Sequence, residues 1–174
     1  MTDDITITVR RARTSDVRAI RAFIDAYAPD RKLLDKPTVT LFEDVQEFWV
    51  AEAADADGSA SAIGCGALHV MWEDLAEVRT LAVDPGWRGK GIGHLVLDQL
   101  LLTARELGVR RVFCLTFEVA FFGRHGFVEI EGSPVAAEVF EELRRSYDEG
   151  VAEFLDLERV KPNTLGNTRM LLHL

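Results

Sequence analysis

The chain has few cysteines and no C-x-x-C pair, and these absences exclude several classes of protein. Its 174 residues contain two cysteines, Cys65 and Cys114, which lie far apart within apolar segments. This spacing argues against a disulfide-stabilised scaffold and against a zinc site, and it predicts two buried thiols. We therefore expect a protein that uses no metal.

The sequence also has no apolar run of bilayer length, and its N-terminus is too polar for a signal peptide. We expect a cytoplasmic protein. Positive charge is in deficit, because 20 lysines and arginines stand against 29 aspartates and glutamates, which gives a formal net charge of −9. That charge argues against nucleic acid or an anionic membrane as a partner. The length predicts a single domain over residues 1–174 with a sizeable core.

Two familiar phosphate-binding loops are missing as well. No G-x-x-x-x-G-K-[ST] string occurs, and the glycines at 91 and 93 are followed by Val96, where the Rossmann fingerprint needs glycine or alanine. Instead, an apolar run ends at Asp84-Pro85, and a basic turn, Arg88–Gly93, leads into an amphipathic helix. Strand, glycine loop and helix N-terminus direct several N–H groups at one point. The segment predicts a pyrophosphate cradle, the alternative being an ordinary glycine-rich turn.

The periodicity of apolar residues predicts alternating helices and strands around one core. The expected strands are 5–9, 48–53, 62–72, 76–83, 112–116, 127–130 and 168–172. The expected helices are 17–27, 39–45, 95–104, 118–125 and about 135–147, the first of them capped at Thr14-Ser15-Asp16. This order favours an α/β sandwich built on a mixed sheet.

The string Arg88-x-x-Gly91-x-Gly93 resembles the acyl-CoA signature of the GNAT N-acetyltransferases, R/Q-x-x-G-x-G/A. VRRVFCLTFEVAFFGRHGF resembles the fifth strand and following helix of that family, and the order of elements agrees along nearly the whole chain. Within the family, the strings EFWVAE, GCGALHV and AEVRTLAVDP are similar to the short, stand-alone actinobacterial N-acetylglutamate synthases. The resemblance implies an α/β GNAT fold, with a mixed, mostly antiparallel central sheet flanked by helices on both faces. It also implies acetyl-CoA as the acyl donor.

By this resemblance, the backbone of the strand before the loop runs beside the pantetheine, and an N–H near Leu81 faces the developing oxyanion. The residues implied in CoA binding are Leu81, Ala82, Val83, Arg88, Gly89, Lys90, Gly91, Ile92, Gly93, His94, Thr116, Phe122 and Arg124. Phe122 stands where many relatives carry a tyrosine acid. Because a free thiol in water has a pKa of about 8.5, the thiolate can leave unaided and we expect no dedicated acid. Tyr147 is the alternative, and Arg124 is either a phosphate ligand or a solvated helix charge.

Glu77 is the candidate general base. On a strand of period two, Glu77, Arg79 and Leu81 share one face, which brings the carboxylate near the acetyl site. A carboxylate there takes the proton of the amine directly or through water. The other interpretation is a structural glutamate paired with Arg79.

An amino-acid acceptor needs cationic partners for its carboxylates. The resemblance implies Lys36 and Thr168 as substrate ligands, with Arg79 and Arg169 as further candidates, Arg169 on the opposite strand face from Thr168. Glycine stands at 166, where related sequences have arginine, which leaves room for glutamine beside glutamate. The arginines at 10, 11 and 13 are expected to be surface charges.

These observations predict acetyl transfer from acetyl-CoA to the α-amino group of L-glutamate or L-glutamine, the first step of arginine biosynthesis, by direct attack in a ternary complex. The resemblance also suggests a homodimer. The alternatives are acetylation of another small amine, of a protein N-terminus or of a lysine, a CoA-binding sensor without turnover, and hydrolysis of acetyl-CoA without an acceptor.

Overall fold

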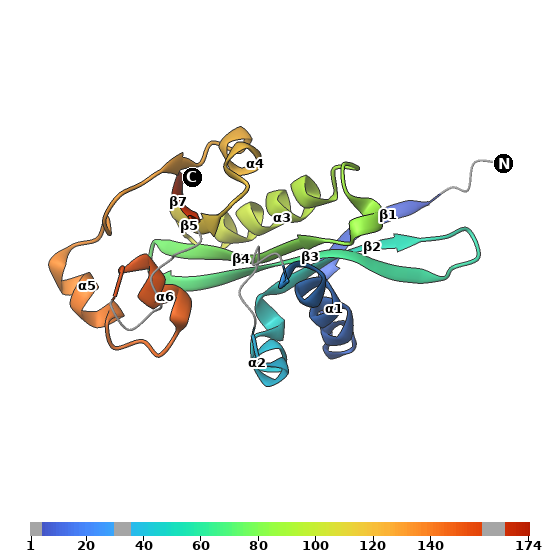
Figure 1. The fold of residues 1–174 in the computed structure, drawn as a ribbon, viewed down its shortest axis with the longest axis horizontal. Coiled ribbons are helices and arrows are strands. Elements are labelled where there is room, and N and C mark those ends of the chain that lie inside the picture. Colours follow the sequence, from blue (N-terminus) through green and yellow to red (C-terminus); the bar gives the residue numbers. More distant parts are fainter. Residues whose placement is uncertain (1–4, 30–35, 158–165) are drawn as a thin grey trace. The chain divides into compact units, whose positions relative to one another are not determined.

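The computed structural model describes residues 5–29, 36–157 and 166–174. Its strands form one seven-stranded sheet in the order β1-β2-β3-β4-β5-β7-β6 (Figure 1). They are β1 (Thr6–Arg11), β2 (Phe48–Ala54), β3 (Ala60–Trp72), β4 (Leu75–Val83), β5 (Arg111–Thr116), β6 (Val128–Glu129) and β7 (Thr168–His173). Strands β4 and β5 pair in parallel, whereas β1–β2, β2–β3, β5–β7 and β6–β7 are antiparallel. The predicted mixed, mostly antiparallel sheet is confirmed.

Helices connect most of the strands. They are η1 (Thr14–Asp16), α1 (Val17–Tyr27), α2 (Thr38–Glu43), η2 (Val45–Glu47), η3 (Pro85–Trp87), α3 (Ile92–Glu106), α4 (Val119–Arg124), α5 (Ala137–Leu143) and α6 (Glu149–Phe154). The predicted helix over about 135–147 is too long, because α5 ends at Leu143. A separate helix, α6, follows, capped by Asp148, whose carboxylate accepts from the N–H of Val151 at 2.9 Å.

The described residues group into two compact units. The first comprises the chain up to Leu68 together with Val78–Thr103, and the second comprises His69–Glu77 together with Ala104–Leu174. The expectation of a single domain over the whole chain stays a prediction.

In the first unit, helices cover both faces of the sheet (Figure 1). The apolar face of α1 packs with Leu41, Phe48, Val50, Cys65 and Ala82 in one buried cluster. On the other face, α3 lies so close to β3 that only glycine fits beneath it. A Cβ at Gly66 would come within 2.9 Å of side-chain carbons of Val96 and Leu100. In the G-C-G string of β3, the Cys65 side chain therefore packs with α1 on one face, and the two glycines let α3 lie close to the other face.

The second unit has its own apolar core around β5. Phe113 and Phe154 are both fully buried, and their rings meet edge to face with centroids 5.2 Å apart. Met71, Leu75, Leu143 and further apolar residues of α6 and β7 complete the cluster.

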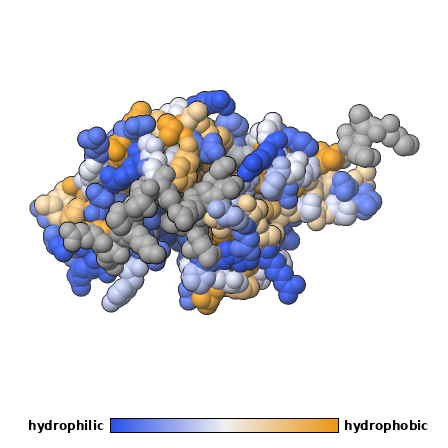
Figure 2. Space-filling model, in the orientation of Figure 1, coloured by the Kyte–Doolittle hydropathy of each residue, from blue (hydrophilic) through white to orange (hydrophobic). Residues whose placement is uncertain are grey.

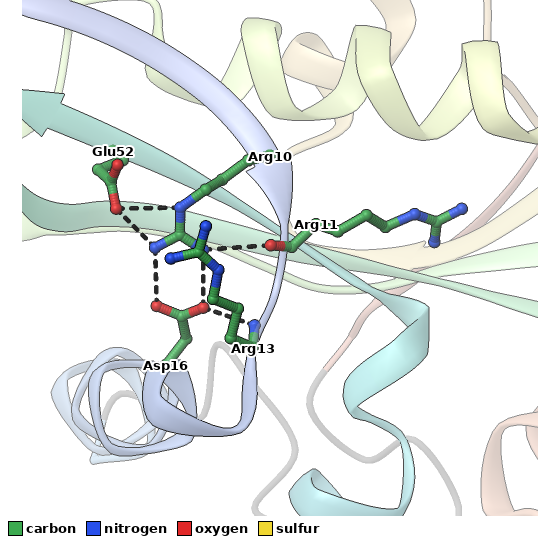
Figure 3. A network of polar contacts seen from close by, with 5 residues as sticks. All are labelled: Arg10, Arg11, Arg13, Asp16 and Glu52. Atoms are coloured by element: carbon green, nitrogen blue, oxygen red, sulfur yellow. Dashed lines mark hydrogen bonds and ion pairs between the residues drawn. The ribbon is translucent and has the colours of Figure 1, made fainter.

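A partly buried ion-pair network ties β1 to β2 and to the start of α1 (Figure 3). Arg10 donates to both carboxylate oxygens of Asp16, at 2.8 and 3.0 Å, and to Glu52 at 2.5 and 3.0 Å. Asp16 also accepts from the N–H of Arg13 at 2.6 Å. The expectation that Arg10 is a plain surface charge is therefore wrong, since its side chain is only 22% exposed. The acidic partners come from other elements, one of them 42 residues away.

Hydrophobic and hydrophilic residues are interspersed on the face drawn in Figure 2. The large apolar residues that stay exposed include Val39, Phe42, Leu95 and Leu102. Scattered exposure of this kind is normal for protein surfaces. Within the described part of the chain, no helix combines the length and apolarity needed to cross a bilayer.

Candidate functional site

The strand that precedes the glycine loop is irregular at Thr80. This residue has φ +51°, in the left-handed region that β-branched residues rarely adopt. Its carbonyl accepts from the Sγ of Cys65 at 3.5 Å. Because a residue that is not extended breaks the alternation of a strand, the argument that Arg79 and Leu81 share one face does not hold across Thr80. Backbone strain of this kind gathers at functional sites.

Glycines of β3 bring β4 and the start of α3 together. A Cβ at Gly64 would lie 3.1 Å from the carbonyl oxygen of Ala82 and 3.0 Å from the side chain of Ile92. Ile92 is the first residue of α3 and is 1% exposed. The end of β4 and the helix N-terminus are thus fixed against the same strand.

The turn after β4 is held by Asp84. Its N–H donates to the carbonyl of Ile63 at 2.8 Å, and its carboxylate accepts from the N–H of Gly86 at 2.7 Å. Gly89 and Gly91 follow with φ values of +75° and +81°, and a Cβ on either would meet no protein atom within 4 Å. Open space beside left-handed backbone at the N-terminus of a 15-residue helix is what an anion cradle needs.

Both cations of the loop lie against aromatic rings. The guanidinium carbon of Arg88 is 4.7 Å from the ring centroid of Tyr27, and the Nζ of Lys90 is 4.5 Å from that of Trp87. The Nε of Arg88 also donates to the hydroxyl of Tyr27 at 3.0 Å. Sequence analysis missed Tyr27, because its position on the apolar face of α1 indicated only a core residue.

Glu77 is a buried carboxylate on β4, 5% exposed. In the parallel pair with β5 it stands opposite Phe113, beside Cys114. Burial raises the pKa of the Cys114 thiol, and the charge of Glu77 raises it further. Burial likewise raises the pKa of the Cys65 thiol to about 12. Both cysteines are therefore protonated near neutral pH, and the role of Glu77 as the base stays a prediction.

The predicted acceptor ligands are distributed over both units. Lys36 lies just before α2, and its carbonyl accepts a hydrogen bond from the guanidinium of Arg21. Arg79, on β4, is 8% exposed. Thr168 begins β7 opposite Thr116 of β5. Their roles toward a substrate stay predictions.

Arg169 has a clear structural function in the second unit. Its guanidinium donates to the carbonyls of Gly132, at 2.8 Å, and of Phe154, and lies 5.6 Å from the ring centroid of Phe113. Burial lowers the pKa of Arg169. These contacts hold the segment after β6 and the end of α6, and they give less support to a substrate ligand than the sequence suggested.

Phe122 packs within an aromatic cluster at α4, and its predicted contact with CoA stays a prediction. Its ring is 6% exposed and meets the rings of Phe121 and Phe127 edge to face, at 5.1 and 5.2 Å. The hydroxyl of Thr116 accepts from the N–H of Glu118 at 2.8 Å and so fixes the turn into α4. Arg124 is exposed at the end of the helix.

Two further observations bear on the chemistry. Tyr147, the alternative acid, is 98% exposed. Among the described residues, no group of three or more histidines, cysteines, aspartates or glutamates is arranged to hold a metal ion.

Comparison with known protein families decides the classification. A model of the acetyltransferase (GNAT) family matches residues 17–127. The chain belongs to the GNAT family. The candidate cradle of this acetyltransferase, from β4 through Gly89 and Gly91 to α3, lies within the matched range.

Individual relatives are similar over different shares of their length. The amino-acid acetyltransferase of Mycobacterium tuberculosis is 65% identical over 164 residues, which cover 94% of this chain and 92% of the relative. The crystal structure of Rv2747 from Mycobacterium tuberculosis, in complex with CoA and NLQ, superposes with a TM-score of 0.90 at 64% identity over 96% of this chain and 99% of that one. An amino-acid acetyltransferase of Aeromonas salmonicida is 30% identical, but the match covers 72% of this chain and only 29% of that longer protein.

Proposed function

We propose that this GNAT protein transfers an acetyl group from acetyl-CoA to the α-amino group of L-glutamate or L-glutamine. The observation that carries the proposal is the cradle itself. Left-handed glycines at 89 and 91 leave open space at the N-terminus of α3, and Arg88 and Lys90 supply positive charge on a chain of net charge −9. A polyanion such as CoA fits that chemistry.

The reaction requires three things of the protein. The acyl donor must be held, which we assign to the loop and to the backbone of residues 81–83. The amine must lose a proton, which we assign to the carboxylate of Glu77. The nitrogen of the neutral amine then bonds to the acetyl carbon and gives up its second proton to water. The carbon–sulfur bond breaks, the amide forms, and CoA leaves as the thiolate. An N–H near Leu81 is proposed to stabilise the oxyanion in between.

The acceptor is inferred from the relatives and from the cations of this chain. A protein 65% identical to this one is named an amino-acid acetyltransferase, and a structure at 64% identity holds CoA with NLQ. Lys36 and Arg79 are the basic residues that we propose for the substrate carboxylates, with Thr168 as a hydroxyl donor. We also propose a cytoplasmic homodimer. The two buried free thiols agree with a reducing compartment.

The test is release of the CoA thiol from acetyl-CoA, followed spectroscopically against L-glutamate, L-glutamine, ornithine, lysine and spermidine. Turnover with the first two alone is the expected result. Preference for the cationic amines would replace the proposed acceptor. Thiol release independent of any amine would indicate a hydrolase, and CoA binding without turnover would indicate a sensor.

The assignment of the base has its own test. Glu77→Gln keeps the shape of the side chain but replaces one accepting oxygen with a donating NH2 group and removes the base, so we expect kcat to fall about 10²- to 10⁴-fold. Glu73→Gln, in the exposed turn between β3 and β4, is the matched control and is expected to leave kcat unchanged. An unchanged kcat in Glu77→Gln would assign the proton transfer to another group.

A further inference from the structure

The phenol of Tyr27 joins the two ends of the turn that carries the glycine loop. Tyr27 is the last residue of α1 and is 8% exposed. Its hydroxyl donates to the carbonyl of Val83 at 2.5 Å and accepts from the Nε of Arg88 at 3.0 Å. Val83 ends β4 and Arg88 begins the basic loop. One side chain from a distant element therefore fixes both.

The ring of Tyr27 restrains Arg88 a second time. The guanidinium carbon lies 4.7 Å from the ring centroid, within the range of a cation–π contact. An arginine side chain loses much rotamer freedom when it is fixed, and a contact that fixes it beforehand removes that cost from ligand binding. Because Arg88 is an exposed residue, the protein needs such a restraint to keep it in one place.

We propose that Tyr27 is a positioning residue for the acyl donor. Through its hydroxyl and its ring, it holds Arg88 and the end of β4 in the arrangement that binds CoA. This inference rests on the proposed function, because it assumes that the loop is the CoA cradle. It assigns to α1 a part in donor binding that the loop signature alone does not contain. It predicts no effect on binding of the amino acid or on the rate of the chemical step.

Tyr27→Phe is the decisive variant, because it keeps the ring and removes only the hydroxyl. Loss of one hydrogen bond to a charged partner and one to a carbonyl is expected to raise the Kd for CoA and the KM for acetyl-CoA about three- to tenfold. The KM for the amino acid and kcat at saturating acetyl-CoA are expected to stay within about twofold of wild type. The chain has two tyrosines, so Tyr147→Phe, at a position 98% exposed, is the matched control. It should change neither the Kd for CoA nor the KM for acetyl-CoA.

A double-mutant cycle with Arg88→Gln separates positioning from general stability. If Tyr27 acts through Arg88, the effect of Tyr27→Phe on the Kd for CoA should fall by half or more in the Arg88→Gln background. Calorimetric titration with CoA measures all four proteins, and thermal unfolding is recorded for each.

Three outcomes would overturn the inference. They are an unchanged Kd for CoA in Tyr27→Phe, a Kd effect that is fully additive with Arg88→Gln, and an equal rise in the KM of both substrates. Failure of the wild-type protein to bind CoA is distinguishable from these, since it would refute the proposed function first. Tyr27→Leu, which removes ring and hydroxyl together, is expected to bind CoA more weakly than Tyr27→Phe.

Discussion

Removing Arg10 tests whether the network of Figure 3 holds the first unit together. Arg10→Met keeps a long apolar side chain and removes the charge. Asp16, whose side chain is 9% exposed, then loses two charge-assisted bonds of 2.8 and 3.0 Å. Breaking a fully buried pair costs about 3–5 kcal/mol, and hydrogen bonds to charged groups are each worth about 1.5–3 kcal/mol. Because the Arg10 side chain is 22% exposed, we expect the lower end, about 3 kcal/mol.

For a chain of this size, that loss should lower Tm by about 6–12 °C. Urea unfolding gives the free energy directly, with an unchanged m-value as the check that the variant unfolds in the same way. Arg145→Met is the matched control. Arg145 pairs with Glu142 at 3.2 Å, but the two side chains are 77% and 56% exposed. Its removal should cost no more than about 0.5 kcal/mol. Equal losses in the two variants would refute the reasoning.

The same network predicts a pH dependence. The side-chain hydrogen bonds from Arg10 lower the pKa of Asp16 in the folded protein, against the opposing effect of burial. A group with a lowered folded pKa contributes stability above its unfolded pKa, here about 3.9, and loses that stability as the pH falls through the folded value. The difference in unfolding free energy between wild type and Arg10→Met should therefore stay constant from about pH 5 to 8 and shrink below about pH 4. A constant difference down to the acid limit would contradict the assignment.

Three further predictions concern the glycine loop, the lysines proposed to bind the two substrates, and the packing of β3. Gly91→Val should abolish CoA binding, because φ is +81° and a β-branched residue rarely adopts that conformation. It should keep the fold, because no protein atom lies within 4 Å of the new Cβ. Gly58→Val, at φ +85°, is the control that keeps CoA binding in a calorimetric titration. Lys36→Ala should raise the KM for the amino acid alone, whereas Lys90→Ala should raise the KM for acetyl-CoA alone, both in the thiol-release assay. Gly66→Ala should cost about 1–3 kcal/mol in urea unfolding, since three side chains lie within 3.0 Å of its Cβ.

The strands were predictable because their signal is local. The expected strand 76–83 is found as Leu75–Val83, and 48–53 as Phe48–Ala54. Both are dense runs of apolar residues bounded by polar turns. The helix expected over about 135–147 ends early, at Leu143, and the separate helix α6 was not predicted, since its start depends on a cap, Asp148, whose acceptor role toward Val151 is clear only once α6 exists.

The glycine loop was predictable because its signal is also local, whereas the residues that hold Arg88 in place were not. Glycines at 89 and 91 after a strand let a ligand approach the backbone closely, and they permit the left-handed conformation found there. The partner of Arg88 is 61 residues away in sequence, on a helix whose pattern marks Tyr27 only as apolar. Arg169 shows a second case in which long-range contacts could not be read from the sequence. A cation near the end of the chain suggested a substrate ligand, but the carbonyls of Gly132 and Phe154 receive its hydrogen bonds.

The alternation of side chains that the sequence predicts for β4 fails at Thr80. Threonine favours extended backbone, so nothing in the local sequence indicates φ +51° in the middle of a strand. Tertiary contacts support the conformation. The thiol of Cys65 donates to the carbonyl of Thr80. Gly66 lets the side chain of Leu81 approach β3, to within 3.0 Å of where a Cβ of residue 66 would lie. Because strain of this kind costs about 1–3 kcal/mol, surrounding structure must maintain it. The irregularity lies directly before the residues proposed to bind pantetheine, so the backbone there is shaped by its neighbours and not by the propensity of the strand.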